Sequence, residues 1–494
     1  MTLKRTDLAL LIALTVASVL VHGYHPNAED AAIYLPGVEQ QLNPGLFPFN
    51  QQFFVSHAQF TLFPRLMALS VQLTHASLYP ILLVWQLLSI FLLLWACLRL
   101  ASLCTESTAG RWAAVCLLAA LLTLPVAGTA LYILDQYVNP RNLAAFTAVM
   151  AIVMMAEVKH VRALFFLILG FSIHPFMSFF ALGFCVLLML MERKRFWSAT
   201  AAGFAPVGFL YPAPTPAYHQ VALSHPYHYL LHWQWYEVLG AIGPLVIFWL
   251  VSRFAANQQR LQLFKMCRAA IVFGVLSLLA GLLLAIPARF EVLARIQPLR
   301  SFYLVYILLI VFLGSLLGEY VLQAHVVRWV VAFLPLCAGM FVTQRMLFPS
   351  SAHIELPGVP SHNPWVRAFQ WSRDHTPQDA RFALDPFHMK IAGEDTNGFR
   401  AIAERSMLAD AVKDSGAVSM FPELAEEWLR QVDAQKGWQN FQAEDFRRLH
   451  AEYGINWVIL QRPPIAGFAC PYENPAVSVC RLDLPTTLSQ KKPL

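Results

Sequence analysis

Long apolar runs without charged residues are the feature that most restricts how this chain can fold. One such run, at 78–98, contains no Asp, Glu, Lys or Arg. About 20 such residues in a helix cross the ~30 Å hydrocarbon core of a bilayer. Over the whole chain, 57% of the 494 residues are hydrophobic and 13% are charged, whereas soluble domains average about 45–50% and about 25%. This composition excludes a single soluble domain, a disordered chain and a coiled coil, and predicts a polytopic α-helical membrane protein.

The apolar runs stop near residue 348, and the charge balance changes there. Residues 1–348 hold 20 Lys and Arg against 11 Asp and Glu, whereas residues 349–494 hold 15 against 18. We therefore expect a transmembrane domain at 1–348 and a small extracytoplasmic α/β domain at 349–494. We expect no nucleic-acid partner, because no dense basic run interleaved with aromatic residues is present.

The apolar runs predict about eleven transmembrane helices. The first follows Lys4 and Arg5, as in a signal peptide, but no small-x-small cleavage site comes after it, so we expect an uncleaved helix and keep a cleaved signal as the alternative. The expected spans are 8–21, 78–103, 112–134, 142–157, 161–173, 176–191, 196–212, 237–252, 269–286, 302–320 and 328–348.

The basic residues give the expected orientation. Cytoplasmic flanks carry an excess of Lys and Arg, and fourteen of them fall on one side against six on the other when the N-terminus is placed in the cytoplasm. An odd number of spans then places the C-terminal domain outside. We expect a multi-pass protein of the inner (cytoplasmic) membrane and cell envelope, with the lipid bilayer as its surroundings.

Two outer loops stand out. The first, 22–77, contains apolar residues at helical spacing over 58–74, and we expect a helix lying in the interface; a twelfth span is the alternative and would reverse the later orientation. The second, 213–236, is crowded with aromatic rings, among them Tyr227 and His228. These rings are typical of the belt at the headgroup level, and the histidine spacing matches no tight metal motif.

Alternating apolar patterns predict the elements of the C-terminal domain. Cys470 and Cys480 are the cysteines outside the apolar spans, and on an oxidising outer face they would close a hairpin as a disulfide. The expected helices are 363–375, 421–435 and 441–453, and the expected strands are 381–385, 457–460 and 477–482.

Charged residues at helix mouths are the candidates for chemistry, since charges near a bilayer are costly. Glu29 and Asp30 open the first outer loop, and adjacent carboxylates near an apolar interface are suited to a general base; a solvated acidic turn is the alternative. Three further positions could bind phosphate or shape a site, or could instead contact lipid headgroups or break a helix. They are Asp135 with Arg141, Arg295 with Arg300, and His174 before Pro175.

This layout resembles the GT-C superfamily of integral-membrane glycosyltransferases. The resemblance covers residues 1–348 and depends on the first helix, the long outer loop opening with Glu29 and Asp30, the segment 58–74 and the many short spans. It implies sugar transfer from a polyprenyl-phosphate donor to an acceptor glycan, lipid or protein on the outer face. A first-loop carboxylate is catalytic in that superfamily, which points to Asp30 and Glu29.

The resemblance also implies roles for other residues. Asp30 would take the proton of the acceptor hydroxyl, direct displacement would invert the anomeric configuration, and Arg141, Arg295 or Arg300 would stabilise the leaving phosphate. Asp135, His174, Tyr227 and His228 would shape the acceptor site. The cofactor is left open: a divalent metal is used by some members, but no motif here specifies one.

Two other classes of function stay open. Short spans broken by proline also occur in transporters and flippases, although no inverted repeat is visible. A catalytically silent GT-C-like scaffold is the third reading. An enzyme requires Glu29 and Asp30 at an outward cavity with an arginine in reach, whereas a transporter requires polar groups near the bilayer midplane.

Overall fold

The computed structural model describes residues 4–192, 214–285, 294–461, 465 and 468–482. It divides into two compact units. The first, here called the helical unit, comprises Met1–Pro26, Phe60–Phe63 and Tyr79–Met346. The second, here called the sheet unit, comprises Asn27–Gln59, Pro64–Leu78 and Leu347–Leu494. Each unit is described by itself below.

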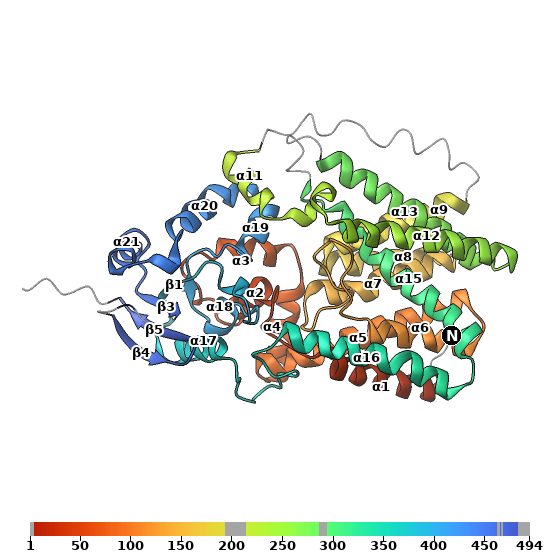
Figure 1. Cartoon of the computed structure of the whole chain (residues 1–494), viewed down its shortest axis with the longest axis horizontal. Coiled ribbons are helices and arrows are strands. Elements are labelled where there is room, and N and C mark those ends of the chain that lie inside the picture. Colours follow the sequence, from red (N-terminus) through yellow and green to blue (C-terminus); the bar gives the residue numbers. More distant parts are fainter. Residues whose placement is uncertain (1–3, 193–213, 286–293, 462–464, 466–467, 483–494) are drawn as a thin grey trace, which may run out of the picture. The chain divides into compact units, whose positions relative to one another are not determined.

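The helical unit consists of apolar helices joined by short connections (Figure 1). Helices α7, α8 and α9 pack on one another, and α12 packs on α13. The helices are α1 (Arg5–His22), α5 (Leu78–Cys104), α6 (Thr108–Ala120), α7 (Pro140–Ala156), α8 (His160–Ile173), α9 (Pro175–Glu192), α11 (Pro216–Leu223), α12 (Trp235–Asn257), α13 (Leu261–Ala285), α15 (Phe302–Leu316) and α16 (Val326–Leu347).

Among the described residues, six helices are long and apolar enough to cross a membrane: α1, α5, α12, α13, α15 with its π-helical extension to Leu322, and α16. Four further apolar helices, α6 to α9, are shorter. The multi-pass helical character expected from the sequence is confirmed, whereas the number of eleven spans is not. The expected span 196–212 lies outside the described residues.

The expected span 112–134 is wrong in its second half. Helix α6 ends at Ala120, and the chain then folds back on itself, with Pro125 bridged to Tyr132 and the amide of Leu134 donating to the carbonyl of Leu122. Pro125 explains the end of the helix, because proline lacks an N–H and its ring would clash with the carbonyl of Leu121.

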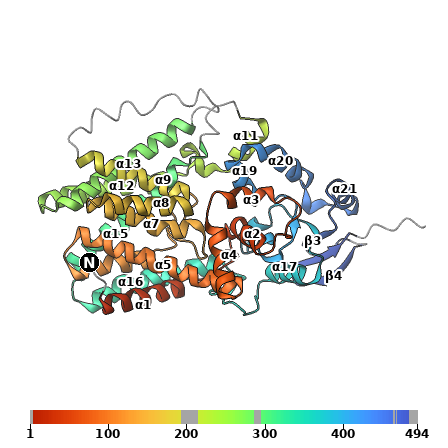
Figure 2. The ribbon, with the colours of Figure 1, turned by 180° about the vertical axis from the view of Figure 1, so that it is seen from behind.

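Small residues allow α15 to lie close against α6. A Cβ atom on Gly314 would lie 2.6 Å from the Cα of Ala114, and one on Gly110 would lie 2.9 Å from the carbonyl oxygen of Ser315. Backbones approach this closely only where side chains are small, which is the usual basis of helix packing in membranes. The two helices lie side by side in both ribbon views (Figures 1 and 2).

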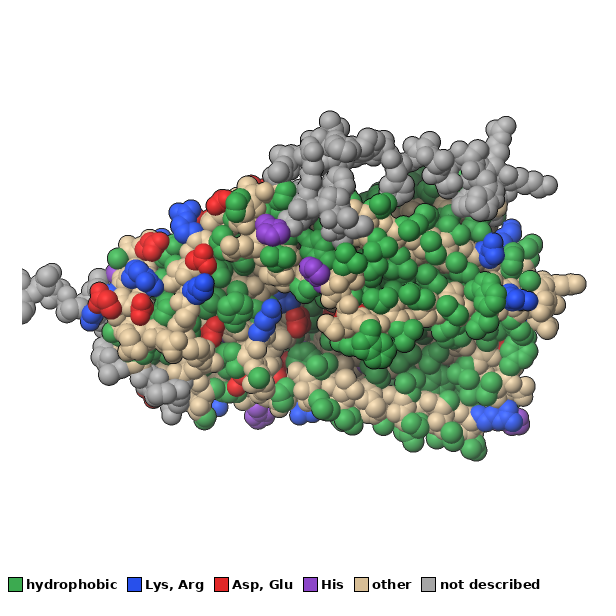
Figure 3. All heavy atoms as spheres, turned by 45° about the horizontal axis from the view of Figure 1, so that its top comes forward, with side chains coloured by type: hydrophobic (Ala, Val, Ile, Leu, Met, Phe, Trp, Pro, Cys, Tyr) green, Lys and Arg blue, Asp and Glu red, His purple; other side chains and the backbone are tan. Residues whose placement is uncertain are grey.

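One face of the helical unit is largely apolar. Figure 3 shows hydrophobic side chains covering its helices with few charges between them, whereas Lys, Arg, Asp and Glu gather on the sheet unit. Large exposed apolar residues of α16 include Val327, Val331, Leu334 and Val342. Apolar side chains on the outside of a helix bundle suit contact with lipid acyl chains.

The sheet unit is built on a five-stranded mixed sheet of order β2-β1-β3-β5-β4. Strands β2, β1 and β3 are parallel, and β3, β5 and β4 are antiparallel. The strands are β1 (Arg381–Leu384), β2 (Ser406–Met407), β3 (Trp457–Gln461), β4 (Ala469–Glu473) and β5 (Val477–Arg481). The helices are α2 (Ala31–Leu42), α3 (Gln52–Gln59), α4 (Phe63–Thr74), α17 (Pro364–His375), α18 (Phe399–Ala403), α19 (Asp414–Met420), α20 (Ala425–Ala434) and α21 (Ala443–Tyr453).

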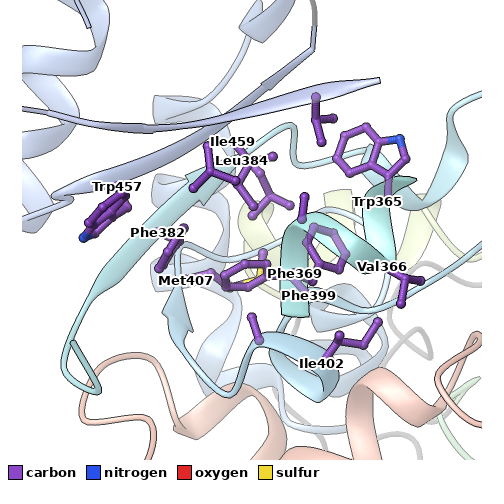
Figure 4. Close-up of a cluster of buried hydrophobic side chains, with 14 of the residues drawn as sticks. Trp365, Val366, Phe369, Phe382, Leu384, Phe399, Ile402, Met407, Trp457 and Ile459 are labelled. Atoms are coloured by element: carbon purple, nitrogen blue, oxygen red, sulfur yellow. The ribbon is translucent and has the colours of Figure 1, made fainter. Parts of the chain in front are cut away.

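Alternating side chains of the strands enter two cores, one on each face of the sheet. Phe382, Trp457 and Ile459 pack with side chains of α17 and α18 on one face (Figure 4). Ala383 and Val458, the alternate residues, pack with Phe446 and Leu449 of α21 on the other. Side chains alternate between the faces of a strand, so the sheet is covered on both sides.

Most of the loop 22–77, namely Asn27–Gln59 and the residues from Pro64 onward, belongs to the sheet unit. The side-chain amide of Asn50 donates to the carbonyl of Met407 in β2 (3.0 Å) and to Oε1 of Gln431 (2.6 Å), and Gln431 donates back to Asn50 Oδ1 (3.0 Å). The amide of Phe49 donates to the hydroxyl of Ser406 (3.2 Å). The loop therefore satisfies polar groups at the β2 edge of the sheet.

The expected helix over 58–74 is interrupted. Helix α3 ends at Gln59 and α4 begins at Phe63, while the hydroxyl of Thr61 donates to the carbonyl of Ile173 and the amide of Leu62 donates to that of Ser172. Pro64 is tolerated in the first turn of a helix but not in its interior. A new helix, α4, therefore begins just before Pro64, and α3 does not continue through it. With 12 residues, α4 is roughly 18 Å long, too short to cross the hydrocarbon core.

Replacing Asn50 with Ala should destabilise the sheet unit. Asn50 and Gln431 are both buried, so the substitution removes the hydrogen bonds that Asn50 makes with the Gln431 amide and the Met407 carbonyl, at a cost of about 1–3 kcal/mol. Thermal unfolding of the purified full-length protein should show a lower midpoint. Asn440→Ala is the matched control, since Asn440 is exposed. An equal midpoint for Asn50→Ala and the control would contradict this role.

Candidate functional site

Glu29 and Asp30 form a tight turn before α2 that is fixed by the chain around residue 396. The amide of Glu29 donates to the carbonyl of Thr396 (2.8 Å), and Ala28 forms an isolated antiparallel bridge with Asn397. Glu29 has a φ of 52°, a left-handed conformation that is uncommon for residues other than glycine. A non-glycine residue is held in this region when its surroundings determine it, so the bridge sets the direction of the two carboxylates.

Lys413 lies between the two carboxylates. Its Nζ is 2.5 Å from Glu29 Oε2 and 2.9 Å from Asp30 Oδ1. The Lys413 side chain is 13% exposed, against 40% for Glu29 and 28% for Asp30. Burial would lower the pKa of Lys413, but the charges of Asp30 and Glu29 raise it well above its ordinary value. The result is a buried ammonium beneath two half-exposed carboxylates.

A second layer of charged residues fixes the backbone of Lys413. Asp410 Oδ1 accepts hydrogen bonds from the amides of Val412 (2.7 Å) and Lys413 (2.5 Å), at the residue that precedes α19. The neighbouring Asp414 binds Arg400 of α18 through two bonds of 2.7 and 2.9 Å, and both side chains are buried. Two parallel N–H···O bonds of this kind fix geometry as well as charge.

His57 of α3 is a further titratable group near Asp30. Burial lowers the pKa of His57 to about 4, although the charge of Asp30 opposes this shift. The imidazole is therefore neutral at pH 7, and its Nδ1 has no hydrogen-bond partner among the described residues. The ring packs edge-on against Phe421 at 5.6 Å between centroids. His57 adds a polar but uncharged group beside Asp30.

Glu39 of α2 differs from the acidic pair. It is buried; this burial, followed by the charge of Glu404, raises its pKa well above the ordinary value, against the opposing charge of Arg373. A buried carboxyl of this kind favours the neutral form. Glu29 and Asp30 are thus the acids of this loop that face solvent.

Asp135 and Arg141 bind each other inside the helical unit. Arg141 Nη2 forms an ion pair with Asp135 Oδ2, and both side chains are buried. Asn139 Nδ2 donates to the same Asp135 oxygen (2.6 Å), and Gln86 of α5 donates to the Asp135 carbonyl (2.8 Å). Asn139 also caps α7, where Pro140 is the first helical residue. The charge of Arg141 is therefore balanced within the protein.

Arg300, Tyr227 and His228 come together in a second cluster of the helical unit. The Arg300 guanidinium lies over the Tyr227 ring, 5.0 Å from its centroid, and the rings of Tyr227 and His228 are 4.5 Å apart. Burial, then the charges of Arg300 and His225, lower the pKa of His228 well below its ordinary value. His228 is therefore neutral at pH 7, and its Nε2 has no hydrogen-bond partner among the described residues.

The remaining candidates take separate places. His174 follows α8, and its Nδ1 accepts a hydrogen bond from the amide of Met177 (3.3 Å) in α9. Arg295 stands shortly before Gln297, a residue in the left-handed conformation. Cys470 and Cys480 are joined in a disulfide between the antiparallel strands β4 and β5.

Lys413 and His57 were not among the candidates from the sequence. Lys413 is separated from Glu29 by 384 residues, and nothing in the pattern around it indicates an acidic partner. The local signal is that of a helix start, since Asp410 precedes Lys413 by three residues. In the described part of the chain, no group of three or more His, Cys, Asp or Glu side chains is arranged to hold a metal ion.

Replacement of Arg141 should lower the stability of the helical unit, and not only its affinity for a ligand. Arg141→Met leaves Asp135 buried without its cation, at a cost of about 3–5 kcal/mol. We expect a lower temperature at which the detergent-solubilised protein leaves the monodisperse peak in size-exclusion chromatography. Arg268→Met is the control, since Arg268 of α13 is exposed. A variant Arg141→Met as heat-resistant as the control would show that the pair has no structural role.

No protein-family model matches the chain, and no curated protein matches it in sequence. The structure is similar to the archaeal oligosaccharyltransferase AglB from Archaeoglobus fulgidus, which was solved with an inhibitory peptide and a dolichol-phosphate. The match has a TM-score of 0.42 and 11% sequence identity, and it covers 92% of this chain and 69% of that one. At these values the similarity alone does not assign the chain to that enzyme's family.

Proposed function

We propose that this protein is a membrane glycosyltransferase that moves a sugar from a polyprenyl-phosphate donor to an acceptor on the outer face of the membrane. The dolichol-phosphate bound by AglB belongs to the same chemical class as the proposed donor. The inverting mechanism, with Asp30 as the base and Glu29 beside it, is part of the proposal.

The observation that carries the proposal is the state of the acidic pair. Both carboxylates are half-exposed, and the ammonium of Lys413 lies 2.5 and 2.9 Å from them. A general base must be deprotonated at the working pH and must reach the proton that it removes. A nearby cation supports the first condition, and the exposed carboxylate oxygens support the second.

In the proposed reaction Asp30 accepts the proton of an acceptor hydroxyl. The oxygen attacks the anomeric carbon of the sugar, a C–O bond forms, and the bond to the phosphate oxygen breaks, so that the phosphate leaves with the electron pair. Proton removal by a placed carboxylate contributes about 10²–10⁴-fold to the rate. A single displacement of this kind inverts the anomeric configuration.

The leaving phosphate requires a cation, and we assign this role to Arg300 before the other arginines. Arg300 lies over Tyr227 beside the neutral His228, an arrangement in which guanidinium and ring can receive an anionic headgroup. Arg141 is already paired with Asp135, so we now assign it to holding the fold around α7. Arg295, His174 and Asp135 stay candidates for shaping the site.

The proposal includes a position in the cell. The N-terminus lies in the cytoplasm, the sheet unit lies outside, and the protein resides in the inner membrane. The disulfide between Cys470 and Cys480 suits an oxidising compartment. A reporter that is active only outside the cytoplasm, fused after Leu494, should be active. An inactive reporter on intact full-length protein would overturn this orientation and the outward site with it.

The test of the function uses cells with and without this protein, compared for lipid-linked sugars and surface glycans. The wild-type protein should restore one sugar modification that the deletion removes. Asp30→Asn should lower that transfer by about 10²–10⁴-fold, because the amide keeps the shape but accepts no proton, and Glu29→Gln should lower it less.

The matched control is Glu426→Gln on the exposed surface of α20, which should transfer sugar at the wild-type rate. All variants are compared at equal amounts of inserted protein. Full transfer by the doubly neutralised Glu29→Gln/Asp30→Asn protein would place the catalytic carboxylate elsewhere or contradict the proposed function.

A further inference from the structure

We propose that Lys413 is a positioning residue of the sugar-transfer reaction: supplied by the C-terminal part of the chain, it contacts the Glu29 and Asp30 carboxylates and fixes their direction. The inference rests on the proposed function, because it assigns the pair a reaction to serve. It gives the C-terminal segment 347–494 a role in catalysis that its small sheet does not indicate by itself.

The geometry of three segments supports this role. The chain at 396–398 binds the backbone on both sides of the acidic turn: Thr396 accepts from the Glu29 amide, and the Gly398 amide donates to the carbonyl of Asn27 (3.4 Å). A Cβ on Gly398 would overlap the side chain of Ala32, so α2 and α18 lie in close contact. The segment at 410–414 then places the ammonium. Both segments come from the C-terminal part of the chain.

Hydrogen bonds on the side away from the carboxylates fix the backbone at Lys413. Asp410 binds the Lys413 amide, the Trp428 indole donates to the Asp410 carbonyl (2.9 Å), and the Asp410 amide donates to Asp414 (2.9 Å). A long lysine side chain ordinarily loses much rotamer freedom when it is held in one place. Here hydrogen bonds fix the backbone at Lys413, and its side chain is mostly buried. The loss of side-chain entropy therefore occurs when the protein folds and not when substrate binds.

The charges explain why an ammonium is required there. Two adjacent carboxylates repel each other, and without a cation one of them takes up a proton more readily. Among the described residues, the groups that act on the pair include Lys413 and, from α3, the neutral His57. Asp410 accepts a hydrogen bond from the Lys413 amide. Asp414 and Arg400 form an ion pair with each other. Lys413 is thus a cation in direct contact with both carboxylates.

The contact itself can be tested without any assay of activity. A carbodiimide joins a lysine amine to a carboxyl group only where the two are in direct contact. In the full-length protein in lipid nanodiscs, we expect digestion and mass spectrometry to show a peptide that joins Lys413 to Glu29 or Asp30. The inference would be overturned if this linked peptide were absent from folded protein in which cross-links of other, exposed lysines are detected.

The functional role is tested by the pH dependence of sugar transfer. Lys413→Met should lower transfer by at least about tenfold at pH 7 and move the acidic limb of the pH profile upward by about one unit. In the double variant Lys413→Met/Glu29→Gln, the acidic limb should return toward its wild-type position, because the Glu29 carboxylate no longer repels Asp30. Lys413→Arg should restore part of the activity. Lys436→Met is the matched control, since Lys436 is exposed and should leave the profile unchanged.

A chemical rescue separates positioning from folding. Lys413→Cys treated with 2-bromoethylamine regains an ammonium at nearly the original length and should regain transfer, whereas the wild-type protein treated in the same way controls for the other cysteines. Wild-type rate and pH profile in Lys413→Met would overturn the inference. The inference would also be overturned if the Lys413 variants lost activity equally at every pH and treatment with 2-bromoethylamine restored none of it. Full activity of Asp30→Asn would instead overturn the proposed function, and it would do so even if the cross-link forms.

Discussion

The hydrogen bonds between the first outer loop and the C-terminal sheet are the interaction on which the candidate site depends. Residues 27–30 bind the chain at 396–398, and Asn50 binds Met407 and Gln431. These bonds make the loop part of the sheet unit, although more than 300 residues separate the two in the sequence. Such a loop would otherwise carry unpaired backbone groups. The acidic pair therefore has a direction that is set by the C-terminal part of the chain.

Charge in this protein is balanced locally. Arg141 binds Asp135, Arg400 binds Asp414, and Lys413 binds Glu29 and Asp30. The first two pairs are buried, and breaking such a pair leaves a costly unpaired charge, so they hold the fold. The third differs because its carboxylates are half-exposed. In the proposed reaction, the exposed carboxylate oxygens would meet the substrate while the cation that contacts them stays buried.

The sequence predicts those parts of the structure that follow from local pattern. The start of α17 at Asn363-Pro364 and the strands β3 and β5 follow from capping and alternation. The helix expected over 112–134 fails because Pro125 and the left-handed Ala127 and Ala130 turn the chain back, and the apolar run hides that turn. Long-range pairings are absent from local pattern, which is why Lys413 was not among the candidates from the sequence, whereas Glu29 and Asp30 were.

The central claim is that the half-exposed acidic pair serves sugar transfer from a polyprenyl-phosphate donor. The most direct measurement reconstitutes the purified protein with lipid-linked sugars extracted from cells that lack it, and follows both lipid and sugar by mass spectrometry. The account predicts that one polyprenyl-phosphate sugar is converted to polyprenyl phosphate while an acceptor gains the mass of that sugar. A lipid-linked pool that stays unchanged in the presence of the folded protein and the acceptor fraction would contradict it.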